Sequence, residues 1–187
     1  MSKRHAHVVL LMEDKQHQAF LTRFLQALGY PPHKLRVLSS PAGQGSGDQY
    51  VRECYSREVR EFRHRLTRSQ HQALVVMIDA DDKETTERLQ QLAKELEQSG
   101  LEPRGETERI AVLVPRRNIM TWIEWLLGKQ VNETDTYSEL KGRERECQPA
   151  VARLVELYQV YRSDRPLPED CPASLIRAIT NELPRLQ

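Results

Sequence analysis

Short apolar runs alternate with helical patterns over the first two-thirds of the chain. Residues 7–12, 73–78 and 109–114 are almost wholly apolar, which is typical of strands buried on both faces of a parallel sheet. A weaker strand is predicted at residues 34–39. Strands that alternate with helices at this spacing indicate βαβ units, so the pattern predicts an α/β fold with a mainly parallel four-stranded sheet flanked by helices.

The segments between the predicted strands have apolar residues at helical spacing. Leu21, Phe24, Leu25 and Leu28 form one face of a first helix, which Gly29 ends. Further helices are predicted at residues 49–68, 85–98 and 119–127. The glycine-rich stretch at residues 40–48, before the helix at 49–68, matches no nucleotide-binding motif.

The pattern changes after Gly128. Residues 129–148 are polar and are expected to be irregular, and helices are predicted at residues 151–161 and 173–183. We therefore expect an α/β domain at residues 1–128. A polar linker and a helical extension, residues 129–187, would follow and pack on the same core.

The composition excludes several classes of protein. No stretch of the 187 residues approaches 18 consecutive apolar positions, so we expect no membrane span. The first residues lead straight into a strand pattern without a small-residue cleavage site, so no secretory signal is expected. Cys54, Cys147 and Cys171 are too far apart for a metal knuckle and odd in number for a disulfide framework. These features predict a soluble, cytoplasmic protein.

The charges are balanced, with 28 basic and 27 acidic residues, so net charge neither supports nor excludes a nucleic-acid partner. Arginine outnumbers lysine by 21 to 7, which favours a phosphate-bearing partner, although GC-rich codon usage would give the same bias. Arg57, Arg60 and Arg63 on the helix at 49–68, together with Arg117, are the candidate nucleic-acid contacts. The competing interpretation is a helix surface of i,i+4 ion pairs, because glutamates interleave with these arginines.

Acidic residues follow two of the predicted strands. They are Glu13 and Asp14 after the first strand, and Asp79, Asp81 and Asp82 after the third. Sites in open α/β sheets form at these carboxyl ends, and carboxylates gathered there repel one another unless a cation neutralises them. Carboxylate oxygens without a His/Cys cluster select Mg²⁺ or Mn²⁺, and the histidines show no ligand spacing. The competing interpretation is a helix cap, which Asp82 alone could provide.

Glu13 at the end of the first strand, Asp79-Ala-Asp81 at the end of the third, and the segment Pro-Arg-Arg-Asn-Ile-Met-Thr-Trp at residues 115–122 resemble the Toprim domain. The resemblance covers residues 6–127. It is strongest to small stand-alone Toprim proteins of prokaryotic defence, which are related to the overcoming-lysogenization-defect nucleases. It implies a Rossmann-like Toprim fold and a Mg²⁺-dependent nuclease for DNA or RNA. Such a nuclease would act in anti-phage or mobile-element defence with a partner ATPase.

The resemblance also implies which residues act. Glu13, Asp79 and Asp81 would be catalytic metal ligands, with Asp82 as a further candidate ligand. A nearby cation would stabilise charge on the phosphodiester oxygens, and Lys15 and Arg116 are the candidates for this role.

The chain departs from the Toprim pattern at two positions. His17 stands where related nucleases place a second acid, and Met120 replaces an acid in the tryptophan segment. These departures favour one metal over two. They also leave a catalytically degenerate interaction subunit as an alternative function. A receiver-like phosphoacceptor domain with Asp79 as the acceptor is another, although no lysine follows the last predicted strand until Lys129.

Overall fold

A computed structural model describes residues 6–38, 46–66 and 72–187 of the chain. Its centre is a four-stranded sheet in the order β2-β1-β3-β4, and every neighbouring pair of strands is parallel. The strands are β1 (His7–Met12), β2 (Leu35–Leu38), β3 (Gln72–Met77) and β4 (Ile110–Leu113). The predicted fold class, an α/β fold with a parallel sheet flanked by helices, is confirmed.

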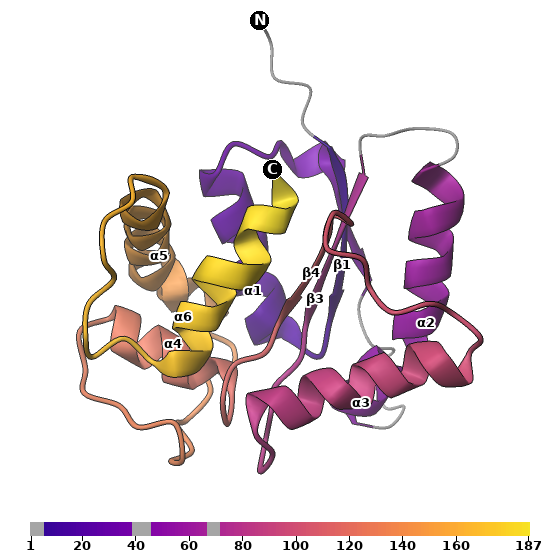
Figure 1. Cartoon of the computed structure of the whole chain (residues 1–187). Coiled ribbons are helices and arrows are strands. Elements are labelled where there is room, and N and C mark those ends of the chain that lie inside the picture. The colour runs from indigo at the N-terminus through magenta and orange to yellow at the C-terminus, as the bar shows by residue number, and fades with distance from the viewer. Residues whose placement is uncertain (1–5, 39–45, 67–71) are drawn as a thin grey trace, which may run out of the picture.

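Helices cover both faces of the sheet (Figure 1). The helices α2 (Gly47–Leu66) and α3 (Thr85–Gln98) pack on one face, and α1 (Lys15–Ala27), α4 (Ile119–Leu126) and α5 (Gln148–Arg162) lie on the other. The helix expected at residues 49–68 is thus α2. The last two residues of that prediction, the last residue of the strand expected at 34–39 and most of the glycine-rich stretch lie outside the described residues.

Alternation along the strands divides the apolar residues between two cores. Val75 and Met77 point into one core together with Phe20 and Phe24 of α1. Leu74 and its alternate neighbours on β3 point into the other core, against α2 and α3. Because β3 is buried on both faces, it is almost continuously apolar, as the sequence pattern predicted.

Residues 129–187 extend the core that α1 and α4 form on one face of the sheet. Residues 129–143 form no helix or strand, and a 3-10 turn (Glu144–Cys147) leads into α5. The helix predicted at 173–183 begins as α6 (Ala173–Arg177) and continues as a π-helical stretch (Ala178–Glu182) and a 3-10 turn (Leu183–Leu186). A further 3-10 turn (Pro32–Lys34) precedes β2. Buried residues of both parts of the chain, such as Phe24 and Leu175, belong to the same core.

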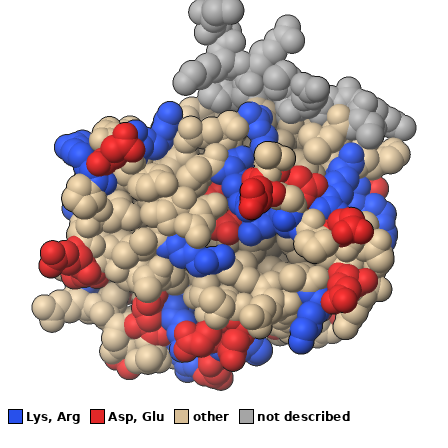
Figure 2. All heavy atoms as spheres, viewed as in Figure 1, with Lys and Arg blue, Asp and Glu red and all other residues tan. Residues whose placement is uncertain are grey.

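Charged side chains of both signs are mixed on the surface. In Figure 2, basic and acidic side chains are interspersed over the face in view and do not gather into a patch of one sign. The three cysteines are free and buried. Within the described ranges, no helix is both long and apolar enough to span a membrane.

Candidate metal centre

The parallel register brings Glu13 and Asp79 together. Met12 pairs with Met77, so β1 and β3 end at the same edge of the sheet and the residues that follow them leave it side by side. The Asp79 backbone N–H donates a hydrogen bond of 2.7 Å to Glu13 Oε1. Two acids 66 positions apart are therefore neighbours, as expected for the carboxyl ends of adjacent parallel strands.

The first residue of α2, Gly47, lies directly against Glu13. A Cβ atom at Gly47 would lie 2.8 Å from the Cβ and from the carbonyl oxygen of Glu13, a separation that real Cβ atoms do not reach. Any larger residue at this position would have to move either β1 or α2. Gly47 thus fixes how closely the helix approaches the first acid.

His17 lies between two carboxylates in the first turn of α1. The Asp14 carboxylate caps this helix by accepting a hydrogen bond of 2.8 Å from the His17 backbone N–H. The His17 ring is fully buried, with Nε2 2.9 Å from Asp79 Oδ1 and Nδ1 3.0 Å from Asp14 Oδ1. The histidines show no ligand spacing in the sequence, yet the structure places His17 beside Glu13 and Asp79. Its spacing of four residues from Glu13, in a helix that starts at the sheet edge, was the signal in the sequence.

Burial and mutual repulsion set the protonation of this cluster. Burial raises the pKa of Glu13 to about 8, and the Asp79 charge reinforces that rise although His17 opposes it. Burial also opposes the charged form of His17, but Asp79 and Asp14 outweigh it and raise the His17 pKa well above its ordinary value. For Asp14 burial again opposes ionisation, yet contacts with His17 lower the pKa to about 2. An imidazolium at His17 is thus the internal counter-charge of the cluster.

Glu13, His17 and Asp79 form the group that could hold a metal ion. Each offers one ligand atom, and these atoms lie within 4.8 Å of one another. The side chain of Asp79 is 10 % exposed, so the group is largely shielded from solvent yet not sealed.

Asp81 and Asp82 are not members of this group in the described residues. Asp81 has a left-handed backbone (φ 55°), and its carboxylate lies 2.7 Å from Nη2 of Arg88. The carboxylate of Asp82 is ion-paired with Arg117. Nor does Asp82 cap the next helix, because Glu84 is the N-cap residue of α3. Both predicted metal ligands are thus ion-paired with arginines in the described part of the chain.

Arg88 is a functional candidate that the sequence reasoning missed. Its side chain is 1 % exposed and donates to the Asp79 backbone carbonyl oxygen at 2.9 Å, as well as to the Asp81 carboxylate. The signal was its place four residues before Leu92, on the face of α3 that turns toward the core. A charged residue at such a position is expected to have partners in the interior.

The two predicted catalytic cations have different surroundings. Lys15 is exposed and lines a cavity of about 200 Å³ together with Glu13. Arg116 donates a 2.6 Å hydrogen bond to the Glu84 carboxylate. Met120 is fully buried in the core. Lys15 is therefore the predicted cation that shares a cavity with the acids.

The predicted nucleic-acid contacts are largely engaged within the protein. Arg57 is paired with Glu58, Arg60 donates to the Ser99 carbonyl oxygen, and Arg63 is ion-paired with Glu108. Arg117, besides its pair with Asp82, donates to Thr136. They differ from the i,i+4 pairs of the competing interpretation, which on α2 join Arg52 to Asp48 and Arg65 to Glu61.

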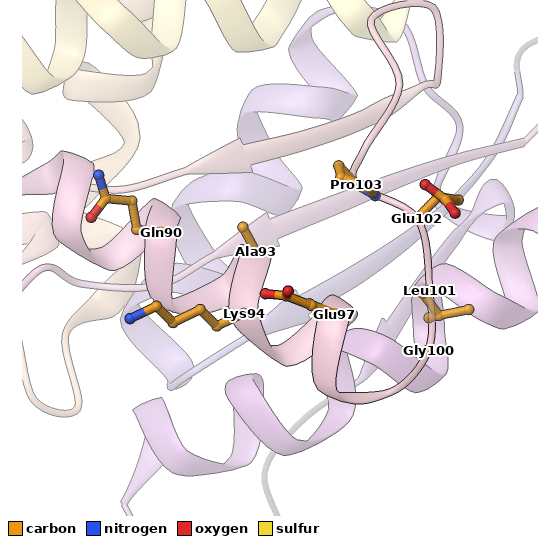
Figure 3. Close-up of a pocket in the computed structure, with 8 residues that line it drawn as sticks. All are labelled: Gln90, Ala93, Lys94, Glu97, Gly100, Leu101, Glu102 and Pro103. Carbon is orange, nitrogen blue, oxygen red and sulfur yellow. The ribbon is translucent and has the colours of Figure 1, made fainter.

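A larger hollow lies away from the acids, beside the C-terminal half of α3 (Figure 3). It has a volume of about 700 Å³, and Lys94, Glu97 and Glu102 contribute charges of both signs to its lining. None of the predicted site residues lines it.

Comparison of the chain with known protein families, with curated proteins and with solved structures gives no match.

Proposed function

We propose that the chain is a Mg²⁺- or Mn²⁺-dependent nuclease of the Toprim type, with Glu13 and Asp79 as its metal ligands. The observation that supports this is the meeting of the two acids at the carboxyl ends of adjacent parallel strands, with ligand atoms within 4.8 Å. The Toprim resemblance implies metal ligands at these two positions, after the first and the third strand. DNA or RNA as substrate, a role in prokaryotic defence and a partner ATPase belong to the same proposal and follow from the resemblance.

The donor atoms fit a divalent cation. Glu13 Oε1 and Asp79 Oδ1 each accept one hydrogen bond, whereas Glu13 Oε2 and Asp79 Oδ2 have no hydrogen-bond partner among the described residues. Two carboxylates, each with an oxygen free to coordinate, are a ligand set that suits Mg²⁺ and Mn²⁺. His17 directs Nε2 at Asp79 and, as an imidazolium, orients that carboxylate rather than coordinating.

Each residue has a distinct role in this proposal. Glu13 and Asp79 hold the cation, which when bound supplies Lewis-acid polarisation of a phosphodiester. His17 fixes one oxygen of Asp79 and leaves the other for the cation. Lys15, in the cavity beside Glu13, offers its ammonium group to the phosphate oxygens, where charge develops during hydrolysis.

Cleavage of labelled oligonucleotides tests the proposal. Single- and double-stranded DNA and RNA would be incubated with Mg²⁺ or Mn²⁺ and with the wild type or Asp79→Asn. We expect the substitution to lower the cleavage rate by at least about 100-fold, because half of the ligand set is lost. The matched control is Asp164→Asn, an exposed aspartate after α5, which should leave the rate unchanged. Equal cleavage by Asp79→Asn and the control would refute the proposal.

A non-catalytic interaction subunit is the second candidate function. One observation favours it: His17 and Arg88 already supply positive charge to carboxylates at this edge. This candidate predicts no cleavage of any substrate and no rise in melting temperature with Mg²⁺, since a ligand must bind the native state to stabilise it.

A further inference from the structure

Arg88 joins three segments of the chain at the sheet edge. Its Nε donates to the carbonyl oxygen of Asp79, and its Nη2 donates to Asp81 at 2.7 Å. Its Nη1 lies 3.3 Å from Asp48 Oδ2, in the first turn of α2, and donates to Gln91 at 2.8 Å. A guanidinium has five donors in a fixed plane and stays charged in proteins, so this residue is a permanent, oriented cation.

The carboxylates at this edge divide into those with an internal cation and one without. Asp48 and Asp81 share Arg88. Asp14 and Asp79 share His17. Glu13 forms no ion pair with any described residue and receives a backbone N–H at Oε1. By charge balance, therefore, one more cation would be needed at this edge, beside Glu13.

From this division we infer that Arg88 stands in for a second metal ion, so that the centre takes a single divalent cation at Glu13 and Asp79. A second metal ion would bring positive charge to additional acids, which otherwise repel one another. Here the buried guanidinium does this for Asp48 and Asp81 and at the same time fixes the Asp79 main chain through its carbonyl oxygen. Arg88 is a positioning residue, since it reaches the cation through Asp79. The inference rests on the metal binding proposed above and adds its stoichiometry.

Counting bound Mn²⁺ tests the inference without reference to activity. The electron paramagnetic resonance signal of free Mn²⁺ would be titrated with wild type, Arg88→Gln and Arg52→Gln. Arg52 is the matched control, because it lies 3.4 Å from the same Asp48 carboxylate but, among the described residues, contacts neither Asp79 nor Asp81. We expect one ion for wild type and control, and a second, weaker ion for Arg88→Gln. Two ions in the wild type, or one ion in a folded Arg88→Gln, would overturn the inference.

A second variant keeps the test decisive if Arg88→Gln does not fold. Asp81→Asn keeps a side-chain oxygen that can accept from Arg88, which also retains Asp48 as a partner, and position 81 is 53 % exposed, so the fold should survive. Because Asp81 serves Arg88 and not the metal, this variant should still bind one Mn²⁺ with an affinity within about fivefold of wild type, whereas Asp79→Asn should lose binding. A loss of binding in Asp81→Asn as large as in Asp79→Asn would overturn the inference.

The two proposals fail in different ways. A wild type that binds no Mn²⁺ contradicts the metal-dependent function itself. A wild type that binds Mn²⁺ but takes two ions leaves that function standing and overturns the role assigned to Arg88.

Discussion

At the scale of single residues, the two acids of the centre are held differently. Asp79 has a charged partner in His17 and a main-chain anchor in Arg88, whereas Glu13 has a single backbone donor. Burial without an ion-pair partner favours the protonated form of Glu13 and raises its pKa to about 8, so ionising this carboxyl group in the folded protein is costly. A divalent cation bound beside Glu13 would offset this cost.

The raised pKa of Glu13 predicts a dependence of stability on pH. In the unfolded chain this carboxyl group titrates near its ordinary value of about 4.3, and in the folded chain near 8. Between these values the folded state keeps a proton that the unfolded state has released. The contribution of Glu13 to the free energy of unfolding therefore falls as pH rises from about 4 to 8 and is level above that.

Glu13→Gln should remove this penalty. With chelator present we expect the variant to be more stable than wild type by about 2 kcal/mol at pH 8, a figure reduced from the full shift for solvent screening, and equally stable near pH 4. Urea unfolding at both pH values measures the difference. Glu53→Gln, on the exposed face of α2, is the control and should show no pH-dependent gain. A Glu13→Gln variant that is no more stable at pH 8 than at pH 4, relative to wild type, would contradict the assignment.

At the scale of elements, the spacing of apolar residues predicted the strands and helices. It could do so because helices cover both faces of the sheet, so strands are largely apolar and helices are apolar on one face. Apolar runs gave β1 and β3, and the acids that end them followed from the topology. The partners of those acids could not be predicted in the same way. His17 and Arg88 enter the site through the rotation of α1 and α3 about their axes, which depends on packing against the sheet. The left-handed backbone at Asp81 could not be predicted either. It accompanies the contact of the Asp81 carboxylate with Arg88, although the sequence predicted Asp81 as a metal ligand.

The arginines of α2 illustrate how an element can be stabilised by residues that resemble a binding face. Arg63 donates to the Glu108 carboxylate at 2.7 Å and to the backbone carbonyl oxygens of Glu102 and Pro103. It therefore ties α2 to the segment that precedes β4. Arg65, by contrast, makes one exposed contact with Glu61 at 3.5 Å.

Arg63→Ala should lower the free energy of unfolding by about 2 kcal/mol, because charge-assisted hydrogen bonds to a partly buried carboxylate and two carbonyl groups are lost. Arg65→Ala is the matched control and should cost at most about 0.5 kcal/mol, as exposed i,i+4 pairs do. Chemical denaturation of both variants provides the comparison. Equal losses would show that Arg63 does not serve as this tie.

At the scale of the whole molecule, the C-terminal segment is part of the α/β core. Trp122 of α4 donates through Nε1 to Ser174 Oγ at 2.8 Å, in the interior. Glu182, which is 2 % exposed, is ion-paired with Arg104 and accepts from the Val112 backbone N–H of β4 at 2.9 Å. The sequence predicted helices here, but the buried ion pair depends on the path of the chain across β4, which periodicity does not specify.

This integration predicts one cooperative unfolding transition, with tryptophan fluorescence and far-ultraviolet circular dichroism changing together. Glu182→Ala should cost about 3 kcal/mol, because it leaves Arg104 and a strand N–H without their acceptor. Glu156→Ala, which removes an exposed pair with Arg153 on α5, is the control and should be nearly neutral. Two separate transitions would show that residues 129–187 fold independently of the sheet.

The claim on which the function depends is that Glu13 and Asp79 hold a divalent cation. A crystal soaked in Mn²⁺ and measured near the manganese absorption edge locates the ion directly by anomalous scattering. We predict one peak, about 2 Å from a carboxylate oxygen of each of these residues. A map with no peak there, or with the peak at Asp81 or Asp82 instead, would contradict the account.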